Sequence, residues 1–68
     1  MTINIMLNGE AKQVNSDYSV AQLLDELNLQ NKRLAVEINQ DLISRSQFSQ
    51  HKFNKDDKVE IVQAIGGG

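Results

Sequence analysis

Aliphatic and polar residues alternate at the start of the chain, a pattern typical of a half-buried β-strand. Within residues 1–7, every second position from Ile3 onward is a large aliphatic residue. An Asn-Gly pair follows at positions 8 and 9, and it favours a two-residue hairpin because both residues tolerate positive φ. We therefore predict a hairpin whose less apolar return strand covers residues 10–14 and forms a sheet edge, with Ala11 facing inward.

A helical pattern comes next. Its apolar residues recur at intervals of three and four positions: Val20, Leu23, Leu24 and Leu27. Ser19 and Gln22 have the spacing of a capping box, in which each side chain satisfies a backbone N–H at the other residue. This predicts a helix that begins after Ser19 and ends near Asn28. The leucine side chains are expected to form much of the core.

Three further strands are predicted, at residues 33–39, 42–43 and 58–65. The last one breaks its alternation at Val62, which predicts burial on both faces. Residues 44–54 show no clear period and are interpreted as a loop with one short helical turn. The first and last strands are the most apolar, so we expect them to lie side by side in the middle of the sheet. The chain is then an α+β fold of about five strands, with one main helix covering one face.

Composition excludes several classes of function. The 68 residues allow one small domain, and the absence of cysteine excludes disulfides and thiolate metal sites. Seven basic against nine acidic residues give a net charge of −2 without a basic stripe, so nucleic acid is not an expected partner. Apolar runs are too short for a membrane span, and no signal peptide is evident, so we expect a cytoplasmic protein without membrane contact.

Three of the four glycines are Gly66, Gly67 and Gly68. Glycine explores φ and ψ freely, so we expect a folded domain at residues 1–65 and a flexible tail at residues 66–68. Such a tail reaches at most about 10 Å when extended. Its carboxylate would enter a narrow cleft that excludes any side chain.

The whole chain resembles the ThiS family, the sulfur carriers of bacterial thiamine biosynthesis. The segments that carry the resemblance are Leu7-Asn8-Gly9-Glu10, Ser19-Val20-Ala21-Gln22-Leu23-Leu24, Ala35-Val36-Glu37-Ile38-Asn39, Arg45-Ser46-Gln47-Phe48 and residues 57–68. The family often has Asn-Gly where this chain has Asn39-Gln40, and often Pro at the position of Ser44. The resemblance implies a ubiquitin-like β-grasp with a mixed sheet.

The resemblance also implies a chemistry for the tail. A ubiquitin-activating-type, ThiF-like adenylyltransferase would adenylate the carboxylate of Gly68 with ATP. A desulfurase system would supply sulfur, giving a C-terminal 1-thioglycine (a thiocarboxylate), and a ThiG-like thiazole synthase would accept that sulfur. Gly66 and Gly67 would pass through the partner's active-site entrance. Because the chain has no cysteine to carry a persulfide, the Gly68 carboxyl is the only plausible site for sulfur. The protein is then a substrate of its partners and not an enzyme, with no bound cofactor.

The remaining candidate residues are weaker indications of function than the glycine tail. We hypothesise that partners contact the exposed sheet face and Ile65, an apolar residue beside the tail. Arg45 and Ser46 are candidates for docking, although Ser46 could equally cap a helical turn and Arg45 could be solvated. His51 is interpreted as a surface loop residue, and Asp56-Asp57 as a turn.

Other functions fit part of this pattern. A molybdopterin-synthase small subunit shares the fold and the tail, but such chains tend to be longer and bind a large subunit stably. A ubiquitin-like modifier would form isopeptide bonds with lysines. A regulatory β-grasp module would require no particular C-terminus.

Overall fold

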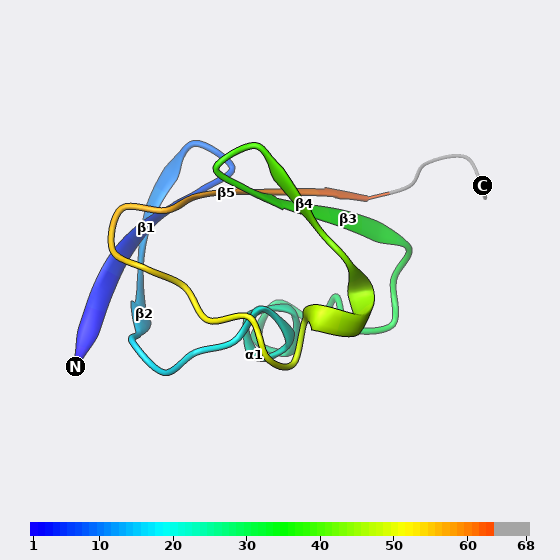
Figure 1. Ribbon diagram of the computed structural model, residues 1–68, viewed down its shortest axis with the longest axis horizontal. Helices are drawn as coiled ribbons and strands as arrows, with labels where there is room; N and C mark the ends of the chain where they lie inside the picture. Colours follow the sequence, from blue (N-terminus) through cyan, green and yellow to red (C-terminus); the bar gives the residue numbers. More distant parts are fainter. Residues whose placement is uncertain (64–68) are drawn as a thin grey trace.

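The computed structural model describes residues 1–63 of the chain (Figure 1). Its elements in chain order are β1 (Thr2–Leu7), β2 (Glu10–Asn15), α1 (Val20–Glu26), β3 (Leu34–Ile38), β4 (Asp41–Ile43), the 3-10 turn η1 (Arg45–Gln47) and β5 (Lys58–Gln63). The predicted order of strands and helix is confirmed. The described part of the last strand stops at Gln63, whereas the sequence pattern continued it to residue 65.

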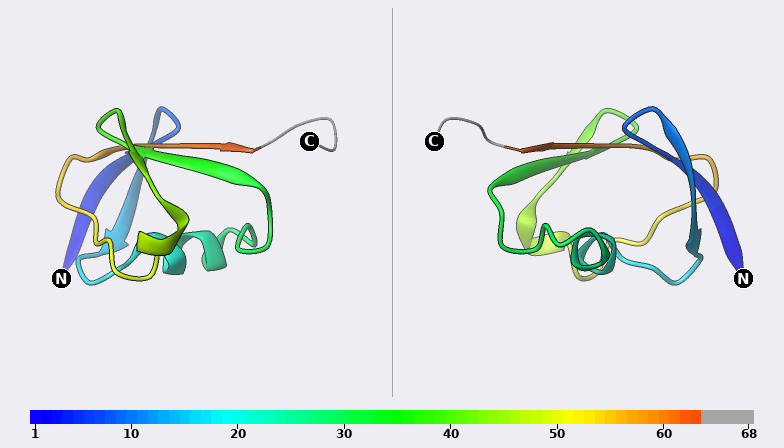
Figure 2. Two further views of the ribbon diagram at one scale, coloured as in Figure 1. Left: turned by 45° about the vertical axis from the view of Figure 1, so that its right-hand side comes forward. Right: turned by 180° about the vertical axis from the view of Figure 1, so that it is seen from behind.

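The five strands form one mixed sheet in the order β2-β1-β5-β3-β4. β5 lies in the middle, parallel to β1 and antiparallel to β3, as expected for the most apolar strands. Both hairpins, β1-β2 and β3-β4, have two-residue loops. Figure 2 shows that α1 covers one face of the sheet and leaves the other face open.

Both ends of α1 are closed by hydrogen bonds that its sequence encodes. The Ser19 side chain accepts from the Gln22 backbone N–H, and the Gln22 side chain accepts from the Ser19 N–H, so the predicted capping box is confirmed. After the C-cap Leu27, Asn28 adopts a left-handed conformation with φ of 60°. The N–H of Leu29 then reaches the carbonyl of Leu24 at 2.8 Å, the reversal that terminates many helices.

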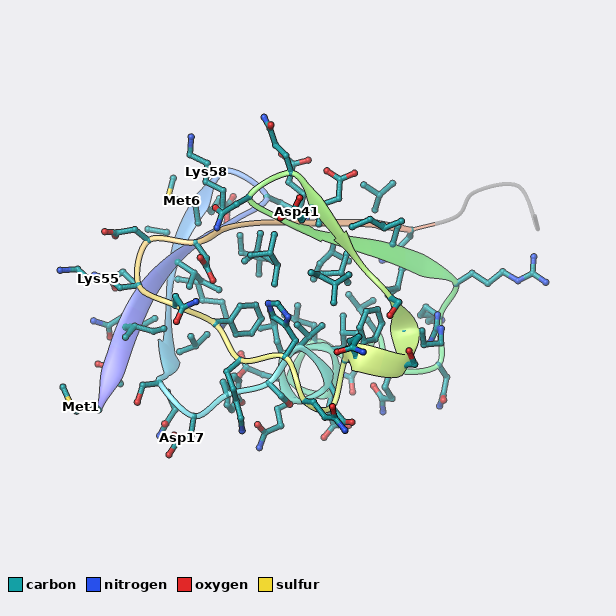
Figure 3. All side chains as sticks on the ribbon, in the orientation of Figure 1. Met1, Met6, Asp17, Asp41, Lys55 and Lys58 are labelled. Carbon is teal, nitrogen blue, oxygen red and sulfur yellow. The ribbon has the colours of Figure 1, made fainter. Side chains whose placement is uncertain are left out.

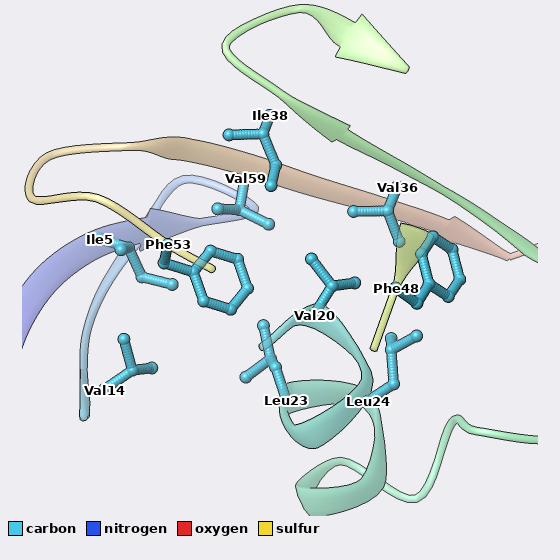
Figure 4. Packing of buried hydrophobic residues seen from close by; sticks show 10 residues of the cluster. All are labelled: Ile5, Val14, Val20, Leu23, Leu24, Val36, Ile38, Phe48, Phe53 and Val59. Atoms are coloured by element: carbon cyan, nitrogen blue, oxygen red, sulfur yellow. The ribbon is translucent and has the colours of Figure 1, made fainter. Parts of the chain in front are cut away.

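The core lies between α1 and the covered face of the sheet (Figure 4). Its buried members are Ile5, Val14, Val20, Leu23, Leu24, Val36, Ile38, Phe48, Phe53 and Val59. Leu23 is fully buried, and a large aliphatic side chain in that state contributes about 1.5–3 kcal/mol. Leu27, the last residue of the predicted stripe, is only half-buried because the helix ends there.

Three details differ from the sequence pattern. Ala11 is exposed, because its register partner Met6 lies on the open face, and Val14 is the buried residue of β2 instead. β5 is not buried on both faces: Val62 is 60% exposed, since no element of the described chain covers that side. Residues 44–54, which showed no period, supply Phe48 and Phe53 to the core.

Candidate functional site

The strand that leads to the glycine tail is held by both hairpin turns. Asn8, in the first turn, makes two hydrogen bonds to β5 with its side-chain amide. Nδ2 donates to the carbonyl of Ile61 at 3.3 Å, and Oδ1 accepts from the Ile61 N–H at 2.8 Å. Its backbone N–H donates to the Val59 carbonyl at 2.8 Å. The amide thus continues the pairing of β5 beyond the end of β1.

The second hairpin turn also binds the start of β5 through the side-chain amide of an asparagine. Asn39 Oδ1 accepts from the Lys58 N–H at 3.0 Å, and Asn39 Nδ2 donates to the carboxylate of Asp57 at 2.9 Å. Asp57, which is buried, also accepts from the backbone N–H of Asn54 at 2.7 Å. These contacts fix the strand from both sides, and they explain why acidic and amide residues occupy these turns.

The predicted turn at Asp56-Asp57 is confirmed. Asp56 has a φ of 67°, and its N–H donates to the Asn4 carbonyl at 2.8 Å. The two asparagine contacts were not foreseen. The Asn-Gly pair at positions 8 and 9 predicted the first turn, but a side chain that pairs with a residue 53 positions away leaves no local signal.

The predicted site residues are distributed unevenly over the structure. Ile65, Gly66, Gly67 and Gly68 lie outside the described residues. Arg45, in η1, donates from Nη2 to the Lys32 carbonyl at 3.1 Å and lies 5.7 Å from the Phe48 ring centroid. Its guanidinium therefore connects η1 to the loop between α1 and β3.

The hydroxyl of Ser46 lies 3.2 Å from that of Ser44. Ser44 occupies the N-cap position of η1 without a side-chain cap hydrogen bond, so Ser46 is not the cap. Docking of a partner to Arg45 and Ser46 stays a prediction.

A charged cluster connects β2 with α1 on the covered side. Glu26 pairs with Lys12 Nζ at 2.7 Å and accepts from the Tyr18 hydroxyl at 2.7 Å. These two contacts, the lysine first, lower the pKa of Glu26. The same hydrogen bond to Glu26, with smaller contributions from desolvation and from nearby acids, raises the pKa of Tyr18.

Chemically reactive groups are sparse in the described part of the chain. Within residues 1–63, no group of three or more His, Cys, Asp or Glu side chains could hold a metal ion. His51 is half-buried in the segment after η1, where its carbonyl accepts from the Val20 N–H. No helix in those residues is long and apolar enough to cross a membrane. The described domain thus places and anchors a strand, and the groups predicted to react lie beyond it.

The five-stranded mixed sheet and the helix packed on one face of it define a class, the ubiquitin-like β-grasp proteins. The ThiS family model matches residues 5–68, and the chain belongs to that family. The crystal structure of the thiamine biosynthesis protein ThiS from Geobacter metallireducens superposes with a TM-score of 0.81 at 29% identity, covering 97% of this chain and 100% of that one.

Two kinds of curated relatives are similar over nearly the whole chain. The sulfur carrier protein ThiS of Escherichia coli is 32% identical over 66 residues, which cover 97% of this chain and 100% of that protein. A thiazole synthase of Paramagnetospirillum magneticum is 36% identical over 66 residues, again 97% of this chain. The chain spans only 20% of that synthase, so a region similar to it forms one part of a longer polypeptide there.

Proposed function

We propose that this protein carries sulfur on the carboxyl group of Gly68 and delivers it for formation of the thiazole ring of thiamine. The observation that carries the proposal is the match to the ThiS family, which extends through residue 68 and includes the whole glycine run. The similarity to a sulfur carrier over the full length of both chains supports the same conclusion.

The chemistry requires activation, because a carboxylate is a poor electrophile. Its oxygen attacks the α-phosphorus of ATP, pyrophosphate leaves, and an acyl-adenylate forms. Hydrosulfide, released from the persulfide of a desulfurase system by a thiol that acts as two-electron reductant, then attacks the acyl carbon and AMP departs, which leaves a thiocarboxylate on Gly68. Both steps take place in a ThiF-like adenylyltransferase. This protein contributes the electrophile and a surface that the enzymes recognise, so it is a substrate and binds no cofactor of its own.

The acceptor partner we propose is a thiazole synthase. The support is that synthases of two organisms, Paramagnetospirillum magneticum and Magnetococcus marinus, are 36% and 33% identical to this chain over 66 residues. In these synthases a region similar to this chain belongs to the same polypeptide as the rest of the enzyme. This arrangement supports a transfer of sulfur from the carrier to the synthase. Gly66 and Gly67 give the carboxyl group access to the enzyme interior, since they carry no side chain that would widen the tail.

Deleting Gly67 and Gly68 tests the proposed function. We expect the truncated protein to keep its melting temperature and to lose all sulfur transfer in a reconstituted thiazole-forming reaction. Thiazole formation at the wild-type rate would contradict the proposal.

Ile65 is proposed as a partner contact because it stands directly before the tail. The Ile65→Asp variant should slow adenylation by the activating enzyme. Unchanged rates with both the activating enzyme and the synthase would remove Ile65 from the interface.

A further inference from the structure

The open face of the sheet carries two ordered rows of side chains over β4, β3 and β5. Leu42, Glu37 and Glu60 are register partners across the three strands and form one row. Ala35 and Val62 pair in the next row toward the end of β5. Cross-strand partners point to the same side of a sheet, and the alternate residues of these strands are in the core. We call the five residues the outer patch.

The outer patch is apolar at its margins. Leu42 is 69% exposed and Val62 is 60% exposed, although side chains of this size are usually buried. Ala35 and Val62 also line a shallow hollow of about 340 Å³, together with Arg33, Leu34 and Gln63. Figure 3 shows Met6 and Lys58, from the other end of the same face, projecting away from α1. The face is therefore uncovered along the length of β5 that the structure describes.

The centre of the outer patch is acidic, and no cation of the described residues 1–63 pairs with it. Glu37 lies directly opposite Glu60, an arrangement in which like charges destabilise a sheet. Among residues 1–63 the one ion pair is Lys12–Glu26, so neither carboxylate has a cation within 4 Å there. Residues 64–68 contain no basic side chain.

Basic residues do occur at both ends of this face. Lys58 precedes Glu60 by two positions, and Arg33 precedes Glu37 by four. Neither is paired with the two glutamates. Two acidic residues that face each other, and that the described residues leave without a cationic partner, are typical of a surface where binding supplies the missing charge.

The position of the outer patch fits a partner that also holds the tail. Val62 and Gln63 are the last described residues of β5, and five residues separate Gln63 from Gly68. Five extended residues span at most about 18 Å. An enzyme that encloses the carboxyl group of Gly68 must therefore extend to within a short distance of the outer patch.

We propose that the outer patch docks the thiazole synthase through an arginine of the synthase that inserts between Glu37 and Glu60. A guanidinium offers five N–H donors in a planar fork, enough to satisfy two carboxylates at once. Apolar groups of the synthase cover Leu42 on one side and Val62 with Ala35 on the other. The proposal rests on the proposed function, which supplies the partner, and adds the chemistry by which that partner recognises the carrier.

Charge-neutral variants test this docking surface. The dissociation constant for the thiazole synthase is measured by calorimetry for wild type, Glu37→Gln and Glu60→Gln. Each substitution should weaken binding about tenfold or more, because it leaves the inserted arginine short of a partner. The same substitutions should leave the melting temperature unchanged or raise it, since they relieve the repulsion. Loss of affinity with a gain in stability separates docking from a structural role.

Glu10→Gln is the matched control. Glu10 is the register partner of Leu7, so it lies on the face that α1 covers, and its loss changes the net charge equally. It should bind like wild type. Equal affinity of wild type and both outer-patch variants, or an equal loss in Glu10→Gln, overturns the docking surface and leaves the carrier function standing. Failure of wild type to bind the synthase contradicts the proposed partner, and with it this docking surface.

Discussion

At the scale of single residues, each hairpin turn has two consecutive residues with positive φ, but the residue types differ between the two turns. In the first turn, Asn8 and Gly9 have φ values of 50° and 85°. In the second, Asn39 and Gln40 have 53° and 74°. Glycine adopts positive φ without a steric penalty, whereas a residue with a Cβ in the left-handed region costs about 1–2 kcal/mol. Gln40 therefore holds strain that Gly9 avoids.

Replacing Gln40 by glycine should stabilise the protein by about 1 kcal/mol, which for a domain of this size raises the melting temperature by roughly 4–8 °C. Thermal unfolding followed by circular dichroism measures the change. Gly9→Ala tests the reverse change and should lower the stability. No atom lies within 4 Å of an added Cβ, so the expected loss comes from backbone strain at positive φ alone. Destabilisation by Gln40→Gly would show that the glutamine side chain stabilises the turn by more than its strain costs.

The contacts of Glu26 make the stability of the protein depend on pH. The pKa of Glu26 is lower in the folded protein than the value of about 4.3 usual for an unfolded glutamate, so its contacts contribute stability above that pH. The contribution is lost as pH falls through the folded pKa. Glu26→Gln should lower the melting temperature slightly at neutral pH, and the difference should shrink as pH falls below the unfolded value and through the lowered folded pKa.

Lys12→Gln should show the same convergence at low pH, because Lys12 is the main cause of the shift. A melting-temperature difference that stays constant from neutral pH down to the acid limit at which the protein is still folded would contradict the assigned contacts. At alkaline pH the Tyr18 contact behaves in the opposite direction. Its pKa is raised, so that contribution is lost as pH rises through the folded value.

At the scale of elements, α1 could be predicted almost completely, whereas in the segment after β4 the sequence predicted only the short helical turn, η1, and not its contacts. The helix has local signals: a capping box, an apolar stripe and an Asn at the left-handed position after the C-cap. Residues 44–54 are placed by contacts with distant residues. The Ala21 N–H donates to the Phe48 carbonyl, and the Val20 N–H donates to the His51 carbonyl. Such pairings leave no periodic pattern in the sequence.

The cap of α1 contributes measurably to stability. Ser19 is 3% exposed and closes a seven-residue helix that has no acidic residue in its first turn. Ser19→Ala should cost about 1 kcal/mol, because the Gln22 N–H loses its acceptor. Chemical denaturation measures the loss, and Ser19→Thr, which keeps the hydroxyl, should recover most of it. Equal stability of the alanine variant and wild type would show that the capping box contributes nothing here.

At the scale of the whole molecule, β5 connects the fold to the proposed chemistry. It is the central strand, it is held by Asn8 and Asn39, and the chain continues from it to Gly68. The proposal of carboxyl chemistry at the glycine run rests on residue type and family resemblance, and it stays a prediction. The acidic pair of the outer patch could not be inferred from sequence, because Glu37 and Glu60 become neighbours only through strand register.

Intact mass spectrometry of the protein tests whether the carboxyl group of Gly68 carries sulfur, as we propose. The protein is incubated with ATP, the activating enzyme and a sulfur donor. We expect a mass gain equal to the exchange of one oxygen for sulfur, located by fragmentation to Gly68 and absent when Gly67 and Gly68 are deleted. An unchanged mass in the wild-type protein, under conditions where the activating enzyme modifies an established ThiS, would show that this protein is not a sulfur carrier.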